Sequence, residues 1–194
     1  MGRIDAADAL EERKLDWNRL ALENAAIALG YALLASLTFT LFRRLGVLPM
    51  PIWPSAALAI VVAVYRGWQA APGVALGTVL ANFCVLGSSF SFALGIAVMN
   101  TLGPLAGGWI VRRLATTRLI IKGPGALLCC FIAIVLLPPL LTATGGIGCK
   151  FYLGMIASDE LVIGWMKWAV AHSLGSLLFA VPVFAWLSFK EEDQ

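Results

Sequence analysis

The stretch FSFALGIAVMNTLGPLAGGWIVRR, residues 90–113, decides the fold class of this protein. It is a long run of apolar and small residues without an acidic side chain, and it ends in two arginines. A helix over residues 90–111 reaches about 33 Å, enough for the roughly 30 Å hydrocarbon core of a bilayer. We therefore predict a membrane-spanning helix here, with Arg112 and Arg113 at one membrane surface.

The same character extends over most of the chain. Of the 194 residues, 60% are hydrophobic and 13% are charged, whereas soluble domains average about 25% charged residues. No Asp or Glu occurs between Glu23 and Asp159. We predict an all-α integral membrane protein, a bundle of about six transmembrane helices. The net charge of +3 is small and the basic residues fall mostly between spans, so the lipid bilayer is the expected partner and no nucleic acid is expected.

Six apolar runs are candidate spans, and they fall at residues 25–42, 54–65, 69–86, 90–111, 126–144 and 161–187. They define a membrane domain over residues 25–188. Residues 1–24 mix charged side chains with leucines and a tryptophan, which predicts a cytoplasmic amphipathic segment. Residues 189–194 form a predicted cytoplasmic tail.

The second run is short, because a helix over residues 54–65 reaches only about 18 Å. Three prolines, Pro49, Pro51 and Pro54, precede or begin it and prevent regular helix there. The second span is therefore predicted to be short or re-entrant. Irregular backbone at membrane depth needs protein or a water-filled cavity around it, so this segment indicates a cavity. The alternative is an ordinary loop at the membrane surface.

The basic residues predict the orientation. With six crossings and an inside N-terminus, ten Lys and Arg residues lie on the inner side and four on the outer side. Such a bias favours both termini in the cytoplasm. The four outer residues are Arg43, Arg44, Lys150 and Lys167.

Two small-xxx-small motifs predict close helix contacts. They are Gly73-x-x-x-Gly77 and Gly103-x-x-x-Gly107. Each motif serves either packing within this chain or contact with a second protein, and the sequence leaves both roles open.

Few polar side chains fall inside the apolar runs, and the most informative are two amides and one histidine. A buried amide must be hydrogen-bonded, and an intramembrane ionisable group is a functional candidate. The structural alternatives are that Asn82 and Asn100 hydrogen-bond to one another and that His172 is a packing residue. The functional hypothesis is a small-molecule pocket in the outer half of the membrane, lined by Trp53, Ser55, Asn82, Asn100, Trp168 and His172.

The residues for catalysis are missing from the spans. Paired carboxylates are absent, one histidine occurs, and the four cysteines show no Cys-x-x-Cys spacing. We therefore expect no enzyme activity, no metal and no cofactor. Gly123 and Gly125, and the run Gly145-Gly146-Ile147-Gly148, are interpreted as turns that flank spans.

Several motifs, taken in order, resemble the type-one membrane-associated sensor domains of bacteria, the MASE family. They cover roughly residues 30–187 and are Trp53-Pro54-Ser55-Ala56-Ala57-Leu58-Ala59, Arg66-Gly67-Trp68, Pro72-Gly73-Val74-Ala75-Leu76-Gly77, Asn100-Thr101-Leu102, Trp109-x-x-Arg112-Arg113, Leu141-Thr142-Ala143-Thr144-Gly145-Gly146 and the closing run from Trp168 to Trp186. Two acidic positions of the family are replaced, one by His172 and one at Gly103-Pro104.

The resemblance implies a non-catalytic sensory module of the bacterial inner membrane that binds a small molecule. Family members usually carry a cytoplasmic signalling domain after the membrane part, whereas this chain ends at Gln194. We therefore expect a membrane or cytoplasmic protein partner in trans, or an excised sensor domain. Two alternatives stay open: a substrate-binding subunit of a vitamin-type transporter, and an accessory structural subunit of a membrane complex.

Overall fold

The computed structural model describes residues 17–114 and 124–192, and the regular elements in these ranges are all helical. The α-helices are α2 (Trp17–Arg44), α3 (Pro54–Arg66), α4 (Ala71–Val79), α5 (Phe90–Leu114), α6 (Pro124–Phe131), α7 (Leu137–Tyr152), α8 (Leu161–Gly175) and α9 (Val181–Glu192). Short 3₁₀ and π segments join them: η1 (Gly67–Ala70), η2 (Leu80–Val85), η3 (Ile132–Leu136), η4 (Ser158–Glu160) and η5 (Ser176–Ala180).

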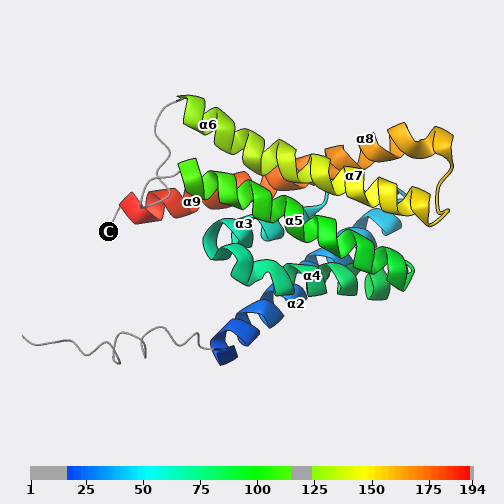
Figure 1. Ribbon diagram of the computed structural model, residues 1–194, viewed down its shortest axis with the longest axis horizontal. Helices are drawn as coiled ribbons and strands as arrows, with labels where there is room; N and C mark the ends of the chain where they lie inside the picture. Colours follow the sequence, from blue (N-terminus) through cyan, green and yellow to red (C-terminus); the bar gives the residue numbers. More distant parts are fainter. Residues whose placement is uncertain (1–16, 115–123, 193–194) are drawn as a thin grey trace, which may run out of the picture.

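Within the described residues, five helices are long and apolar enough to cross a membrane, and they are Trp17–Arg44, Pro54–Val85, Phe90–Leu114, Pro124–Tyr152 and Ser158–Trp186. The second does not run straight. Ser55 at the start of α3 and Gly77 near the end of α4 both contact Tyr31, so the chain reverses between them (Figure 1). Counting α3 and α4 separately gives six passes along the bundle, in agreement with the predicted bundle of about six helices.

The reversal between α3 and α4 depends on Gly67. This residue ends α3 with φ +56°, a conformation that favours glycine. Its missing side chain also leaves space for the guanidinium of Arg112 on α5. The turn therefore joins α3, α4 and the end of α5 at one end of the bundle.

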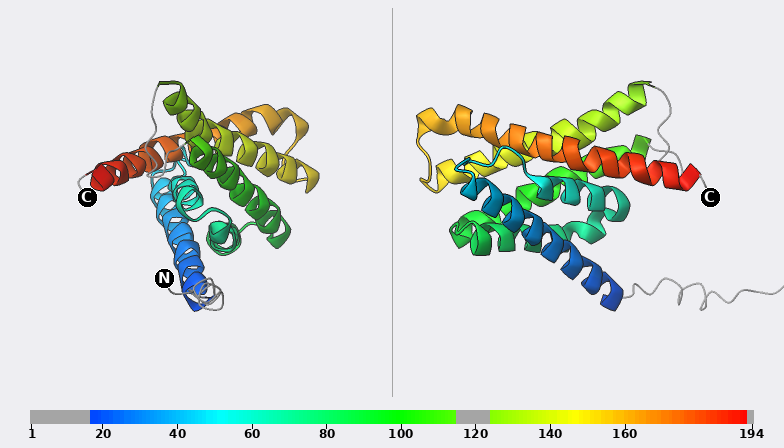
Figure 2. Two further views of the ribbon diagram at one scale, coloured as in Figure 1. Left: turned by 60° about the vertical axis from the view of Figure 1, so that its left-hand side comes forward. Right: turned by 180° about the vertical axis from the view of Figure 1, so that it is seen from behind.

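The short helix α3 lies at the centre of the bundle. Its 13 residues reach about 20 Å, as predicted for a short second span. Its buried residues are Pro54, Ser55, Ala57, Ala59, Ile60, Ala63 and Val64. Helices α2, α5 and α8 surround it, and the two views of Figure 2 show this enclosure. Protein on several sides lets a helix too short to span a bilayer remain in the membrane.

The glycines of both small-xxx-small motifs are buried in helix contacts within this chain. A Cβ on Gly73 would lie 2.8 Å from the Asn24 carbonyl oxygen, and one on Gly77 would lie 2.7 Å from Tyr31 Cβ. Gly103 packs against the Pro138 carbonyl oxygen, 3.1 Å from a built Cβ, and Gly107 approaches the Ala133 carbonyl. These glycines therefore pack α4 on α2 and α5 on η3 and α7.

Prolines shape the last two passes. Pro138 and Pro139 follow the π segment η3, and Pro182 follows the π segment η5. Proline has no N–H to donate and its ring collides with the carbonyl four residues earlier, so the preceding turn widens. Both passes nevertheless continue as helix through the prolines.

The prediction that Gly145, Gly146 and Gly148 form a turn is wrong. These residues lie inside α7, which continues to Tyr152. Gly145 faces Met99, and a Cβ on Gly146 would lie 2.8 Å from the ring of Trp168. The glycines therefore allow α5 and α8 to approach α7. Of the other two glycines, Gly125 is the second residue of α6 and Gly123 lies outside the described residues.

The two ends of the bundle are formed by different segments. At one end Glu23 pairs with Arg66 and, at 3.0 Å, with Arg19. Residues 1–16 of the predicted amphipathic segment lie outside the described residues, and residues 17–24 form the first turns of α2. At the opposite end lie the irregular segment 45–53, the turn 86–89 and the segment 153–160.

Candidate functional site

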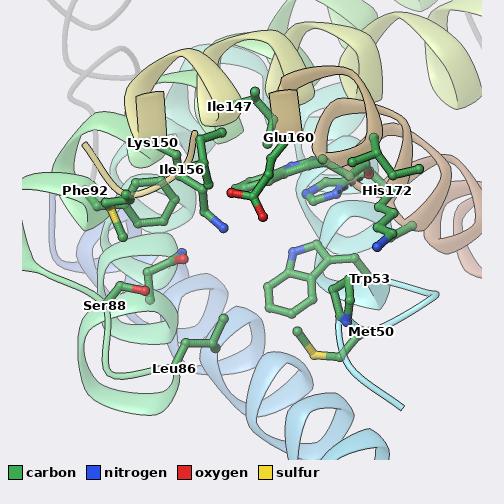
Figure 3. A pocket seen from close by; sticks show the side chains of 18 of the residues that line it. Met50, Trp53, Leu86, Ser88, Phe92, Ile147, Lys150, Ile156, Glu160 and His172 are labelled. Atoms are coloured by element: carbon green, nitrogen blue, oxygen red, sulfur yellow. Dashed lines mark hydrogen bonds between the residues drawn. The ribbon is translucent and has the colours of Figure 1, made fainter. Parts of the chain in front are cut away.

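A cavity of about 330 Å³ opens at the end of the bundle that carries the proline-rich segment. Its walls come from this segment, from η2, α5, α7 and α8, and from the segment between α7 and α8. The lining residues are Pro49, Met50, Trp53, Asn82, Leu86, Ser88, Phe92, Asn100, Ile147, Lys150, Met155, Ile156, Glu160, Ile163, Gly164, Lys167, Trp168, Ala171 and His172. Figure 3 shows Trp53, Lys150 and Glu160 directed into the same space.

Five of the six predicted site residues line this cavity: Trp53, Asn82, Asn100, Trp168 and His172. The exception is Ser55, which is fully buried and donates a hydrogen bond to the Tyr31 carbonyl oxygen at 3.0 Å. Ser55 therefore joins α3 to α2 and has a structural role. Whether the cavity binds a ligand stays a prediction.

Trp53, the last residue of the irregular segment before α3, contacts α8. Its backbone N–H donates to the Ala171 carbonyl oxygen at 2.9 Å. Its carbonyl lies against Gly175, where a side chain would collide with it. Its indole Nε1–H donates to the Tyr31 hydroxyl at 3.3 Å. The bond to Ala171 satisfies a backbone N–H that lies outside any helix, and with the contact at Gly175 it attaches the segment to α8.

A row of aromatic rings forms one wall of the cavity. The His172 ring lies 6.0 Å from Trp53 and stacks on Trp168 at 5.7 Å, measured between ring centroids. Trp168 in turn meets Phe92 edge to face at 6.3 Å. The spacing of Trp168 and His172, four residues apart on α8, places both rings on one helix face.

The two buried amides have different partners, which contradicts the alternative that they bond one another. Asn82 Nδ2 donates to the Thr78 carbonyl oxygen at 2.9 Å. Asn100 Nδ2 donates to the Tyr31 hydroxyl at 3.1 Å. Tyr31 therefore accepts hydrogen bonds from both Trp53 and Asn100 and links α2, α5 and the irregular segment. Tyr31 was not among the predicted site residues, although a tyrosine within an apolar span is itself a buried polar group that needs partners.

Three charged residues at the cavity were also missed. Lys150 and Lys167 were interpreted only as topology signals, and Glu160 was assigned no role. Lys150 Nζ lies 5.4 Å from the Trp168 ring centroid and 5.6 Å from that of Phe92. Glu160 Oε2 accepts a hydrogen bond from the Ala157 backbone N–H at 3.1 Å. The available signal was that each lysine directly precedes an aromatic residue, Phe151 after Lys150 and Trp168 after Lys167.

Three buried polar atoms in cavity-lining side chains have no hydrogen-bond partner within the described residues. They are Asn100 Oδ1, Trp168 Nε1 and His172 Nε2. His172 Nδ1 lies 3.2 Å from the Trp168 carbonyl oxygen. A carbonyl only accepts, so Nδ1 carries the proton and neutral His172 presents an acceptor at Nε2. The site thus offers two unpaired acceptors and one unpaired donor.

No cluster of three or more His, Cys, Asp or Glu side chains is found in residues 17–114 and 124–192. Each of the four cysteines is free. The chemistry on offer at the cavity is therefore aromatic contact, hydrogen bonding and charge.

The helical bundle with its apolar exterior defines a multi-pass integral membrane protein. The family model for MASE1 matches residues 24–192. The chain therefore belongs to the MASE1 family of membrane-associated sensor domains, as its motifs predicted. No curated protein and no solved structure matches the chain.

Proposed function

We propose that this domain is a non-catalytic sensor that binds a small molecule in the cavity beneath Trp53 and passes the change to α8 and α9. The observation that carries the proposal is the set of unpaired buried atoms on Asn100, Trp168 and His172, all on side chains that line one cavity. An unpaired buried polar group is costly, and a ligand with complementary groups would remove that cost. A mostly apolar cavity with a few polar anchors is the usual form of a small-molecule site.

Helix α8 is the proposed route of the signal. It carries Trp168 and His172 at the cavity and continues through η5 into α9, which ends at Glu192. The π segment η5 begins directly after Gly175, where the Trp53 carbonyl lies against the helix. Wide turns of this type occur frequently at functional sites. A ligand that moves Trp53 would therefore alter α8 at its least regular point.

The proposed location is a bacterial inner membrane, with both termini in the cytoplasm. Arg66, Arg112 and Arg113 lie at the end of the bundle opposite the cavity. With that end inside, as the excess of basic residues favours, the cavity faces the outer side. The signal would then travel inward to a protein partner at the inner end of α9. The glycine motifs are occupied by packing within the chain, so such a partner would contact other helix faces.

Cavity filling tests the binding proposal. Gly164 lines the cavity, whereas Gly148 on α7 has nothing near a built Cβ. Gly164→Leu and Gly148→Leu are therefore matched variants that differ in whether the added side chain enters the cavity. The chain is purified in lipid nanodiscs, incubated with a protein-free metabolite extract from the producing cells, and weighed by native mass spectrometry.

The proposal predicts a small-molecule mass on the wild type and on Gly148→Leu that is lost on Gly164→Leu. A mass present equally on all three, or on none, would argue against a binding site in this cavity.

A further inference from the structure

We propose that the cavity selects a small aromatic anion: a flat ring with a carboxylate at one end and an O–H or N–H donor on the ring. This inference rests on the proposed function, because it names the ligand class of the same site. Three independent features of the cavity define the class: its aromatic walls, its excess of positive charge, and its unpaired acceptors.

The aromatic walls favour a flat ring. Trp53, Phe92 and Trp168 all line the cavity, and His172 lies between the two tryptophans. Aromatic rings pack well against other rings in offset or edge-to-face arrangements. A flat ring covers these faces more completely than a branched aliphatic group of similar size.

The charges favour an anion. Two lysines and one glutamate line the cavity, and Glu160 already accepts a bond from Ala157 N–H. No ion pair is found for Lys150 or Lys167 among residues 17–114 and 124–192. Lys150 instead lies against two aromatic faces. A carboxylate would give its ammonium a charge-assisted hydrogen bond, which is about twice as strong as a neutral one.

The unpaired acceptors require a donor on the ligand. Asn100 is 4% exposed and His172 is 7% exposed, so water reaches their unpaired acceptor atoms poorly. Both acceptor atoms, Asn100 Oδ1 and His172 Nε2, are buried, so a phenol O–H or an indole N–H would donate to one of them once its side chain turns toward the cavity. The unpaired Trp168 Nε1–H could donate in return to an oxygen of the ligand.

A series of probes that share one ring isolates the charge preference. The first series shares a hydroxyphenyl ring and consists of the acid 4-hydroxyphenylacetate, the alcohol 2-(4-hydroxyphenyl)ethanol and the amine tyramine. Phenylacetate keeps the carboxylate but lacks the O–H donor on the ring. Indole-3-acetate, indole-3-ethanol and tryptamine repeat the series on a larger ring. Binding to the full chain in nanodiscs of uncharged lipid is measured by titration calorimetry.

In at least one series, we expect the acid to bind at least tenfold more tightly than the alcohol and the amine. Phenylacetate should bind about tenfold more weakly than 4-hydroxyphenylacetate. Lys150→Met should abolish the preference for the acid and leave the alcohol's affinity unchanged. Arg44→Met, which removes an exposed charge at the same end outside the cavity, should change neither.

Two outcomes overturn the ligand class. One is that the alcohol or the amine binds as tightly as the acid in both series, and the other is that no probe binds. If the alcohol binds without preference and Gly164→Leu abolishes that binding, the cavity remains a binding site and only the ligand class fails. Equal melting temperatures of the wild type and each variant establish that a lost preference is not a loss of folding.

Discussion

At the residue scale, Tyr31 holds the walls of the site together. Its hydroxyl accepts hydrogen bonds from Trp53 Nε1 and Asn100 Nδ2, and the side chain is almost fully buried. The bond from Trp53 fixes the irregular segment, and the bond from Asn100 fixes α5 against α2. A single phenol thus positions two of the residues that line the cavity.

Tyr31→Phe should therefore destabilise the protein, because it leaves two buried donors without an acceptor. The expected loss is about 1–3 kcal/mol of unfolding free energy, measured as a lower unfolding midpoint in mild detergent. Tyr152→Phe is the matched control, since Tyr152 is 88% exposed. Equal midpoints for the two variants would show that Tyr31 does not have this role.

The depth of a residue along its span can be read from the sequence, whereas the direction of its side chain around the helix cannot. Trp53, Asn82, Asn100, Trp168 and His172 were placed at similar depth from their positions in the spans, and they do line one cavity. The partner of Asn100 depends on which face of α5 meets α2, and span positions alone do not give that direction.

At the element scale, the glycine motifs determine how closely the helices pack. A side chain at Gly107 would meet the Ala133 carbonyl and, at 3.0 Å, Ile60 Cδ1. We expect Gly107→Leu to destabilise the protein by about 3 kcal/mol, because overpacking a tight contact forces backbone shifts. Gly148→Leu should change stability by less than about 1 kcal/mol, since its site is open. Thermal unfolding followed by circular dichroism compares the two, and similar midpoints would refute the assigned contact.

The span pattern predicted most of the helices, and local chemistry explains the differences. The short second span follows from the prolines before it, and the reversal at Gly67 matches the predicted gap between spans. Gly145, Gly146 and Gly148 were predicted to form a turn because glycine usually interrupts helices. Here they continue α7 and leave room for Met99 and Trp168, so tertiary packing overrides local propensity.

At the scale of the whole molecule, orientation decides which side of the membrane the cavity faces. The six-span topology predicted from the sequence puts ten basic residues inside and four outside, and this bias predicts that the end opposite the cavity is cytoplasmic. Reporter fusions after Gln194 should give a cytoplasmic signal, and fusions after Ser158 an external one. The reverse pattern would turn the cavity toward the cytoplasm and contradict the proposed direction of signalling.

The central proposal is that a ligand in the cavity alters η5, the π segment that directly follows α8. This proposal can be tested without knowing the ligand. Gly164→Cys, in a background in which the four native cysteines are replaced by alanine, is modified with benzyl methanethiosulfonate to place an aryl group in the cavity. Gly148→Cys, modified in the same way, places that group outside it. Amide hydrogen exchange of Ser176–Ala180 is then followed by mass spectrometry.

We predict that modification at residue 164 changes the exchange rate of this segment several-fold and that modification at residue 148 leaves it unchanged. Equal exchange in both modified proteins would contradict coupling between the cavity and α8.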